Sequence, residues 1–140
     1  MTIPLVIDAS VSFRLTLPGA QQKLYQSLAD QWLDDGYLLC APMLWVYEMT
    51  SALCKIVRLG ELTPEEGQRT LASVRSLEIQ LFAPDDEQIR LAFEWTARLK
   101  RAAAYDSFYL ALAEVMQCDL WTADKRLCNA VDLPWVRVAG

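Results

Sequence analysis

Short apolar runs alternate with amphipathic segments along the whole chain. The runs predict β-strands at residues 3–7, 37–41, 78–83, 119–122 and 135–138. Between them, after a strand-to-helix turn at residues 8–11, the periodicity predicts helices at about 20–33, 43–59, 64–76, 85–100, 105–116 and 125–131. Strands joined by helices run parallel, and the helices cover both faces of their sheet. The sequence therefore predicts an α/β fold around a parallel sheet.

The length of the chain matches one domain, and we expect residues 1–140 to fold as a single unit. The N-terminus lacks the basic region of a signal peptide. The longest uncharged apolar stretch covers residues 37–47, whereas a membrane-spanning helix needs about 20 residues. We therefore expect a cytoplasmic protein with no membrane partner.

The four cysteines form no CxxC pair and lie in apolar or helical segments, at Cys40, Cys54, Cys118 and Cys128. Free cysteines commonly behave as small buried hydrophobic residues. We expect reduced thiols in the core, and the count also permits disulfides or a four-thiolate metal site.

The chain contains no histidine, which excludes Ser-His-Asp triads, Cys-His dyads and HExxH zinc sites. Carboxylates, Lys, Tyr, Cys or a metal must therefore carry any catalysis. The formal net charge is −5, from 18 acidic and 13 basic residues. A nucleic-acid site would have to be a local positive patch.

Four acidic residues lie where a parallel α/β sheet binds ligands. Asp8 directly follows the first predicted strand and Asp124 follows the fourth, so both should lie at the carboxyl edge of the sheet. Asp106 begins a nearly apolar helix. Glu48 faces away from the apolar stripe of its own helix, which we expect to pack in the core and which consists of Val46, Met49, Thr50, Leu53, Ile56 and Val57.

Each of these acids has a simpler interpretation on its own. Asp8 and Asp124 can cap helices, Asp106 can interact with a helix dipole, and Glu48 can be a solvated surface charge. Four carboxylates beside apolar chain cannot converge without a counter-charge, however. A hard divalent cation, Mg²⁺ or Mn²⁺, prefers such oxygen ligands, so together the four acids predict a metal site.

The segments that carry these acids resemble the PIN-domain ribonucleases, and among them the VapC toxins of type II toxin–antitoxin pairs. The matching segments are residues 6–10 (VIDAS), the helix that contains Glu48, residues 105–113 (YDSFYLALA) and residues 122–127 (TADKRL). The resemblance covers essentially the whole chain, with the segments in the right order. It implies an α/β/α sandwich around a parallel sheet of four or five strands. It also implies a metal-dependent endoribonuclease that is usually a homodimer and is inhibited by a cognate antitoxin protein.

The resemblance assigns a role to each acid. The family's catalytic and metal-binding quartet corresponds to Asp8, Glu48, Asp106 and Asp124, which would hold one or two Mg²⁺ or Mn²⁺ ions. The hydroxyl residue often found beside the last acid corresponds to Thr122, and Ser10 holds a similar position near the first. We expect these two hydroxyls to orient a carboxylate or a water molecule.

An RNA substrate would need positive charge near the acids. Three basic pairs are candidates for phosphate binding: Lys55 and Arg58, Lys100 and Arg101, and Lys125 and Arg126. Each pair can instead be an ordinary solvated helix end.

Five tryptophans in a domain of this size predict apolar surface beyond the core, which a homodimer face and an antitoxin groove would use. For Trp45, packing in the core or in an interface is favoured over stacking on a base.

Three other functions are compatible with parts of the pattern. A catalytically silent PIN-like module could bind RNA or protein, with metal serving only structure. A HAD-type phosphatase needs two aspartates that flank one residue after the first strand, and here that segment is Asp8-Ala9-Ser10. A flap-type DNA nuclease shares the chemistry, but the chain lacks the length for its helical arch.

Overall fold

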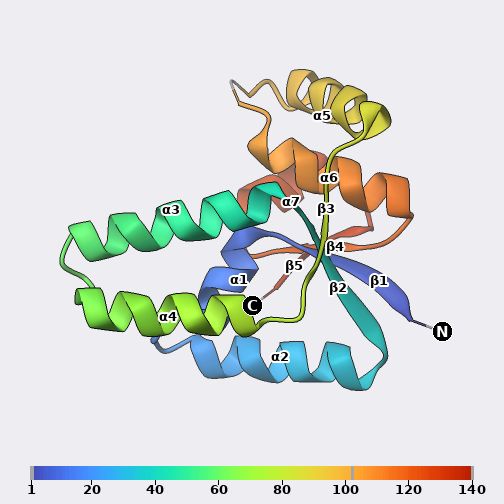
Figure 1. Ribbon diagram of the computed structural model, residues 1–140. Coiled ribbons are helices and arrows are strands. Elements are labelled where there is room, and N and C mark those ends of the chain that lie inside the picture. Colours follow the sequence, from blue (N-terminus) through green and yellow to red (C-terminus); the bar gives the residue numbers. More distant parts are fainter. Residues whose placement is uncertain (1, 102, 140) are drawn as a thin grey trace.

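The computed structural model describes residues 2–101 and 103–139 (Figure 1), so residues 1, 102 and 140 of the expected single unit lie outside the described residues. The strands are Ile3–Ile7 (β1), Tyr37–Pro42 (β2), Gln80–Phe82 (β3), Leu120–Thr122 (β4) and Val136–Val138 (β5). The helices are Ala9–Thr16 (α1), Gln22–Asp34 (α2), Leu44–Arg58 (α3), Pro64–Ser76 (α4), Asp86–Arg98 (α5), Tyr105–Met116 (α6) and Lys125–Val131 (α7). All strand pairs are parallel, in the order β3-β2-β1-β4-β5, which confirms the predicted fold class with five strands.

Strand β1 lies at the centre of the sheet, and its two faces pack against different helices. Successive side chains of a strand point to opposite faces. Leu5 and Ile7 belong to an apolar cluster with residues of α1 and α2, whereas Val6 belongs to a cluster with residues of α3, α6 and α7. In Figure 1, α2 lies below the sheet and α5 and α6 lie above it. The layers therefore form an α/β/α sandwich.

Helices α3 and α4 lie side by side and extend away from the sheet, on the left of Figure 1. Helix α4 begins with a capping box, because the Thr63 hydroxyl accepts the Glu66 N–H and the Glu66 carboxylate accepts the Thr63 N–H. The two helices approach closely at Gly67. A Cβ atom added there would lie 2.5 Å from Cγ2 of Val57 on α3, so the absence of a side chain permits this packing.

The buried stripe of α3 differs from the one expected from periodicity. Trp45, Met49 and Leu53 are buried, whereas Val46 and Thr50 are exposed, so the core position predicted for the last two is wrong. A tertiary contact explains the rotation of the helix. The Trp45 indole N–H donates a hydrogen bond of 2.8 Å to the hydroxyl of Ser12 on α1, and this contact turns the Trp45 side of α3 toward the core.

The tryptophans serve the core more than the surface. Trp32, Trp45 and Trp95 are buried, and the rings of Trp121 and Trp135 pack against Trp32 and Trp95. The packing favoured for Trp45 is therefore confirmed. The expected apolar surface is present, but residues such as Leu24, Leu59 and Phe93 provide it in place of the tryptophans.

The four cysteines are free thiols and differ in burial. Cys40 is buried, and Cys118 and Cys128 are half-buried. Cys54 is exposed on α3, so the expected core position is wrong for this residue.

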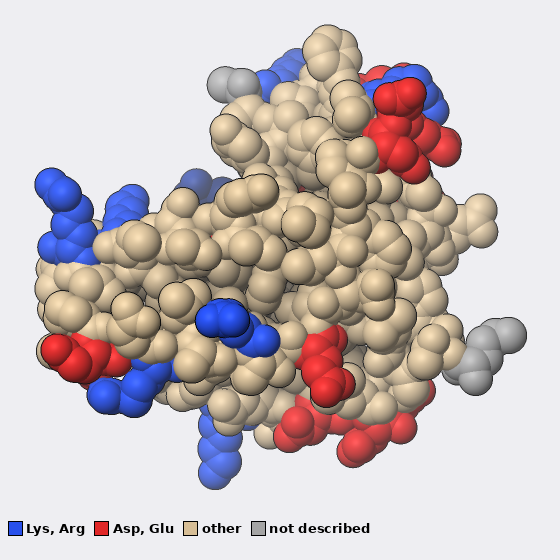
Figure 2. Space-filling view, in the orientation of Figure 1, with Lys and Arg blue, Asp and Glu red and all other residues tan. Residues whose placement is uncertain are grey.

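Charged side chains of both signs are visible on the face shown in Figure 2. Lys and Arg gather mainly over the end of the α3–α4 pair, and acidic side chains gather at the end of α2 and the start of α5. Among the described residues, no helix combines the length and apolarity that crossing a membrane would require.

Candidate active site

Asp8 follows β1 directly and caps helix α1. Its Oδ1 accepts the Val11 N–H at 3.1 Å and the Ser10 hydroxyl at 2.5 Å. The residue is only 8% exposed. Burial raises the pKa of the Asp8 carboxyl, and hydrogen bonds from Ser10, Thr122 and Val11 partly oppose this increase. The same carboxylate thus caps the start of α1 and provides an acid with a raised pKa at the carboxyl edge of the sheet.

Glu48 lies on α3 and contacts α6 through a buried tyrosine. The Tyr109 hydroxyl donates a hydrogen bond of 2.7 Å to Oε1 of Glu48, and Tyr109 is only 1% exposed. Burial raises the pKa of Glu48, the bond from Tyr109 lowers it, and the charges of Asp106 and Asp8 raise it again. Burial and the bond to Glu48 also raise the pKa of Tyr109. Tyr109 therefore fixes one oxygen of the Glu48 carboxylate and remains protonated while doing so.

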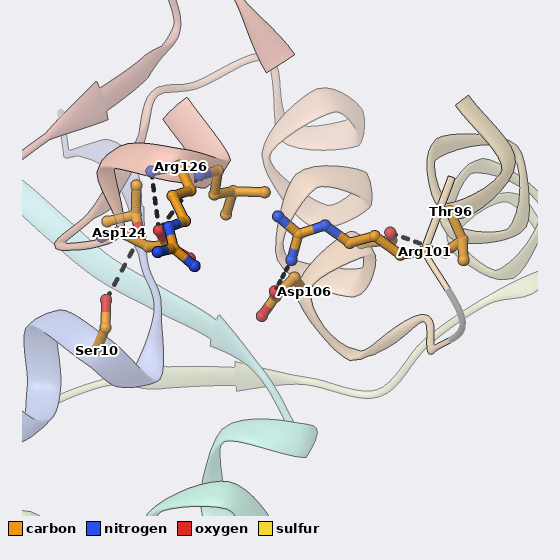
Figure 3. Close-up of polar contacts among 9 residues, drawn as sticks. Ser10, Thr96, Arg101, Asp106, Asp124 and Arg126 are labelled. Carbon is orange, nitrogen blue, oxygen red and sulfur yellow. Dashed lines mark hydrogen bonds and ion pairs between the residues drawn. The ribbon is translucent and has the colours of Figure 1, made fainter. Parts of the chain in front are cut away.

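Asp106 lies in the first turn of α6 and forms an ion pair. Nη1 of Arg101 lies 2.9 Å from Oδ2 of Asp106, with both side chains partly exposed. The Arg101 N–H donates to the Thr96 carbonyl at the end of α5. Figure 3 shows the Arg101 side chain reaching past the start of α6 toward Asp106. One of the predicted acids therefore already has a counter-charge from the chain itself.

Asp124 caps α7 and is linked to Asp8 through two hydroxyl groups. Its Oδ1 accepts the N–H groups of Arg126 and Leu127 at 2.9 and 3.3 Å. The Asp124 N–H donates to Oγ1 of Thr122 at 3.0 Å, and that oxygen lies 3.4 Å from Oγ of Ser10. Ser10 Oγ also accepts the Ala123 N–H at 2.9 Å, a contact visible in Figure 3.

The topology explains why these acids share one edge of the sheet. Strands β2 and β3 extend the sheet on one side of β1, and β4 and β5 extend it on the other. The change of direction between β1 and β4 creates a crevice at their carboxyl ends, where ligands bind in sheets of this kind. Asp8 and Asp124 follow these two strands, and Asp106 lies on the helix that leads into β4.

The donor set suits a hard divalent cation. Burial raises the pKa values of Asp8 and Glu48, and the charge of Asp106 raises both further, so a cation beside these acids would offset their desolvation and their repulsion. Within residues 2–101 and 103–139, however, no three acidic or cysteine side chains converge closely enough to enclose an ion as they stand. Three of the carboxylates already have partners within the chain. Asp106 binds Arg101, Glu48 binds Tyr109, and Asp124 binds N–H groups of α7. Binding of an ion would therefore require side-chain rotation.

The predicted basic residues lie in different places around the acids. Lys55 lines the same cleft as Glu48, whereas Arg58 lines a separate cavity between α3 and α4. Lys100, which is exposed, has a positive φ of 55° just after α5. Lys125 and Arg126 line a cavity of about 600 Å³ beside Ser10 and Asp124, and we name it the basic cavity.

Two residues at the site were not found by reading the sequence. Tyr109 lies three positions after Asp106, which places both on neighbouring positions of one helical face, and this spacing was an available signal. Arg14, four positions after Ser10 on α1, also lines the basic cavity. The Arg14 guanidinium lies over the ring of Tyr25 and donates a hydrogen bond to Gln21. These contacts depend on the fold, and no sequence pattern predicts them.

Comparison with known proteins identifies relatives over nearly the whole chain. Residues 6–132 match a family model described as PIN domain. The chain is 32% identical over 125 residues to Ribonuclease VapC9 of Mycobacterium tuberculosis, with 89% of each chain covered. The identity and coverage are the same for VapC ribonuclease Mb0985 of Mycobacterium bovis.

Solved structures share the fold. PAE2754 from Pyrobaculum aerophilum has a TM-score of 0.68 and 25% identity, covering 97% of this chain and 83% of that chain. VapBC2 from Rickettsia felis, solved with a DNA fragment of its promoter, has a TM-score of 0.71 and 11% identity, covering 98% of both chains.

Proposed function

The chain belongs to the PIN domain family, and from this premise we propose that it is an endoribonuclease that acts as the toxin of a type II toxin–antitoxin pair. The two relatives at 32% identity are named VapC ribonucleases, and their alignment extends over 89% of this chain. The observation that carries the proposal is the group of carboxylates at the β1–β4 crevice. Asp8 is buried and Glu48 is half-buried, and both acids have raised pKa values and are held by hydroxyl groups at the edge where this kind of sheet binds ligands.

The proposed reaction depends on Mg²⁺ or Mn²⁺, with one or two ions held by Asp8, Glu48, Asp106 and Asp124. A bound divalent cation would neutralise phosphate charge and lower the pKa of a water molecule. The chain's own residues position this acid set. Ser10 and Thr122 hold Asp8 and link it to the backbone of Asp124, and Tyr109 leaves Oε2 of Glu48 free of its own hydrogen bond.

The basic cavity supports binding of an RNA backbone next to the acids. Arg14, Lys125 and Arg126 line it together with Asp124, so positive charge lies directly beside the proposed reaction centre. Such contacts position phosphates without reading sequence. We include Lys55 on the opposite side, where it shares a cleft with Glu48. Arg101 would reach a phosphate only after leaving Asp106, and Lys100 and Arg58 are assigned to more distant parts of the RNA.

The proposed partners are an antitoxin protein and a second copy of the chain. Structural neighbours include a toxin–antitoxin complex from Klebsiella pneumoniae, with a TM-score of 0.69 and 12% identity. This likeness supports an antitoxin partner for the present chain. We further propose that the chain acts in the cytoplasm as a single PIN domain over residues 1–140.

A catalytically silent binding module is the second candidate function. The observation in its favour is the Arg101–Asp106 ion pair, which neutralises a predicted metal ligand without any ion. A module of this kind would bind RNA or protein but would cleave nothing.

Mapping of new RNA 5′ ends tests the proposal. Total RNA is treated with wild-type protein and Mn²⁺ or Mg²⁺, with wild-type protein and chelator, and with an Asp8→Asn variant and metal. Asparagine is also a good helix cap and can accept the Val11 N–H, so the fold should be retained. We expect new ends only in the first arm, with a loss of at least about 100-fold in the variant, the scale seen when a key electrostatic group is removed.

Two results would contradict the proposal. Cleavage by Asp8→Asn at the wild-type rate would remove Asp8 from the site. Absence of new ends, together with absence of Mn²⁺ binding in calorimetry, would favour the silent module.

A further inference from the structure

The segment between α5 and α6 holds the backbone of Arg101 in place. Helix α5 ends in a Schellman motif, in which Lys100 has the positive φ and the Arg101 N–H donates to the Thr96 carbonyl at 3.1 Å. From this anchored position the Arg101 side chain extends to Asp106, in the first turn of α6. Figure 3 shows its guanidinium on the side of α6 toward Asp124.

The ion pair between Arg101 and Asp106 is a single, accessible contact. Nη1 of Arg101 lies 2.9 Å from Oδ2 of Asp106, and the two side chains are 32% and 43% exposed. Within the described residues the guanidinium makes no second hydrogen bond, so its other N–H groups remain available to an acceptor. Ion pairs this exposed stabilise a protein little, so Arg101 can exchange Asp106 for another anion with little loss of free energy.

The cations of the basic cavity are in a different state. Arg14, Lys125 and Arg126 form no ion pair in the part of the chain that the structure describes. Their charge is available to an RNA phosphate whether or not a metal ion is bound. The charge of Arg101, by contrast, is already neutralised by Asp106, one of the proposed metal ligands. Whether Arg101 can bind a phosphate therefore depends on what else binds Asp106.

A divalent cation and the Arg101 guanidinium compete for the same carboxylate. The charge of Asp106 raises the pKa values of Asp8 and Glu48, so the three acids lie within electrostatic reach of one another. A cation held by these acids would neutralise Asp106 and release Arg101. A planar guanidinium can donate to two phosphate oxygens at once, so a phosphate of the bound RNA is a suitable new partner.

We propose that Arg101 couples metal binding to RNA binding: it pairs with Asp106 while no divalent cation is bound, and it transfers to a phosphate of the RNA backbone when the cation takes Asp106. This inference rests on the proposed function and adds a link between its two ligands. Such coupling is reciprocal, so RNA raises the affinity for the cation by the same factor as the cation raises the affinity for RNA. Full RNA affinity is therefore reached only with the cation in place.

The test measures fluorescence anisotropy of a short, fluorescein-labelled 2′-O-methyl oligouridylate, whose integrity is checked by electrophoresis after each titration. Binding is measured in Mn²⁺ and in chelator, each over a series of KCl concentrations. The variants are Arg101→Gln, which removes the charge, and Arg101→Lys, which keeps the charge without the planar guanidinium. Two controls each remove one other positive charge, Lys100→Gln beside Arg101 and Arg14→Gln in the basic cavity.

We expect Mn²⁺ to strengthen binding most in the wild type. Arg101→Gln should bind within about twofold of wild type in chelator and roughly tenfold more weakly in Mn²⁺, which corresponds to the loss of one charge-assisted hydrogen bond. In Mn²⁺ the slope of log affinity against log salt should also be shallower for Arg101→Gln by about 0.7, the value for one phosphate contact on a single strand. Arg101→Lys should lie between the two. Each control should weaken binding by the same factor in both solutions.

Three results would overturn the inference. Equal weakening by Arg101→Gln with and without Mn²⁺ would show that the contribution of Arg101 does not depend on the cation. Wild-type affinity and salt slope for Arg101→Gln in Mn²⁺ would show that Arg101 contacts no phosphate. A wild-type affinity for the oligonucleotide that is the same in Mn²⁺ and in chelator would show that the two ligands are not coupled.

The proposed function can fail separately from this inference. A protein that cleaves no RNA, but whose Arg101→Gln variant binds more weakly only in Mn²⁺, retains the coupling and lacks the endoribonuclease activity. Conversely, metal-dependent cleavage by a protein whose Arg101→Gln variant binds like wild type in both solutions removes the coupling alone.

Discussion

The carboxylates of this site are each restrained by a different neighbour. Asp8 is held by a serine hydroxyl, Glu48 by a buried tyrosine and Asp106 by Arg101. The Arg101 contact differs from the other two because it brings a full positive charge. A divalent cation that binds Asp106 has to compete with this guanidinium, so the ion pair should lower the metal affinity of the site.

Replacing Arg101 with Gln should therefore increase Mn²⁺ affinity. The pair is partly exposed, and exposed pairs contribute about 0.2–1 kcal/mol, so we expect an increase of roughly 1.4- to 5-fold. Calorimetric titration with Mn²⁺ measures the change directly. Lys100→Gln is the matched control, because it removes one positive charge at the position next to Arg101. Lys100 itself forms no ion pair within the described part of the chain. Equal affinities in the two variants would show that Arg101 does not compete.

Among the elements, the α3–α4 pair positions Glu48. Helix α3 carries this residue, and α4 packs along α3 through the close approach at Gly67. Val57 is β-branched and has one strongly preferred rotamer in a helix, so it cannot easily move away from an added methyl group. The spacing of the two helices thus depends on a glycine in the second turn of α4.

We predict that Gly67→Ala destabilises the protein even though alanine is the better helix former. Alanine should gain about 1 kcal/mol in propensity, but overpacking against Val57 should cost about 1–3 kcal/mol. Urea unfolding measures the difference in free energy. In a Val57→Ala background the space is open, and the same substitution should become neutral or stabilising. If Gly67→Ala were equally destabilising in both backgrounds, the close contact with Val57 would not be its cause.

Local pattern predicted the elements well, because strand and helix periodicities are written in consecutive residues. It also placed Asp8 and Asp124 at one edge, since parallel strands on either side of a change in direction bring their carboxyl ends together. It failed where a distant contact decides the outcome. The Trp45–Ser12 bond rotates α3, and the partners of Glu48 and Asp106 come from other segments. Burial and pairing of each acid are tertiary properties that no single segment contains.

For the whole molecule, the buried Asp8 and the half-buried Glu48 make stability depend on pH. Burial raises the pKa of Asp8 and of Glu48 above their ordinary values of 3.8 and 4.5. Between these values and the raised pKa values of the folded protein, the folded state therefore binds more protons than the unfolded state. In that interval the free energy of unfolding falls as pH rises.

The metal-free protein should consequently have a higher Tm at pH 5.5 than at pH 7.5, as measured by calorimetry in chelator. Asp8→Asn should be less sensitive to pH, because it removes one of the two groups. Mn²⁺ at pH 7.5 should raise the Tm of the wild type by binding the folded state, and it should do so less for Asp8→Asn. A wild-type Tm that increased from pH 5.5 to pH 7.5 in chelator would contradict the assigned direction of these pKa values.

The contact between Ser10 and Thr122 joins residues 112 positions apart in the sequence. A ribosome makes the Asp8 end of the site early and the Asp124 end much later. Until β4 has emerged and paired with β1, Asp8 has Ser10 beside it but lacks the Thr122 hydroxyl and the neighbouring strand. A nascent chain therefore lacks the complete group of acids until Asp124 has been synthesised and β4 has paired with β1.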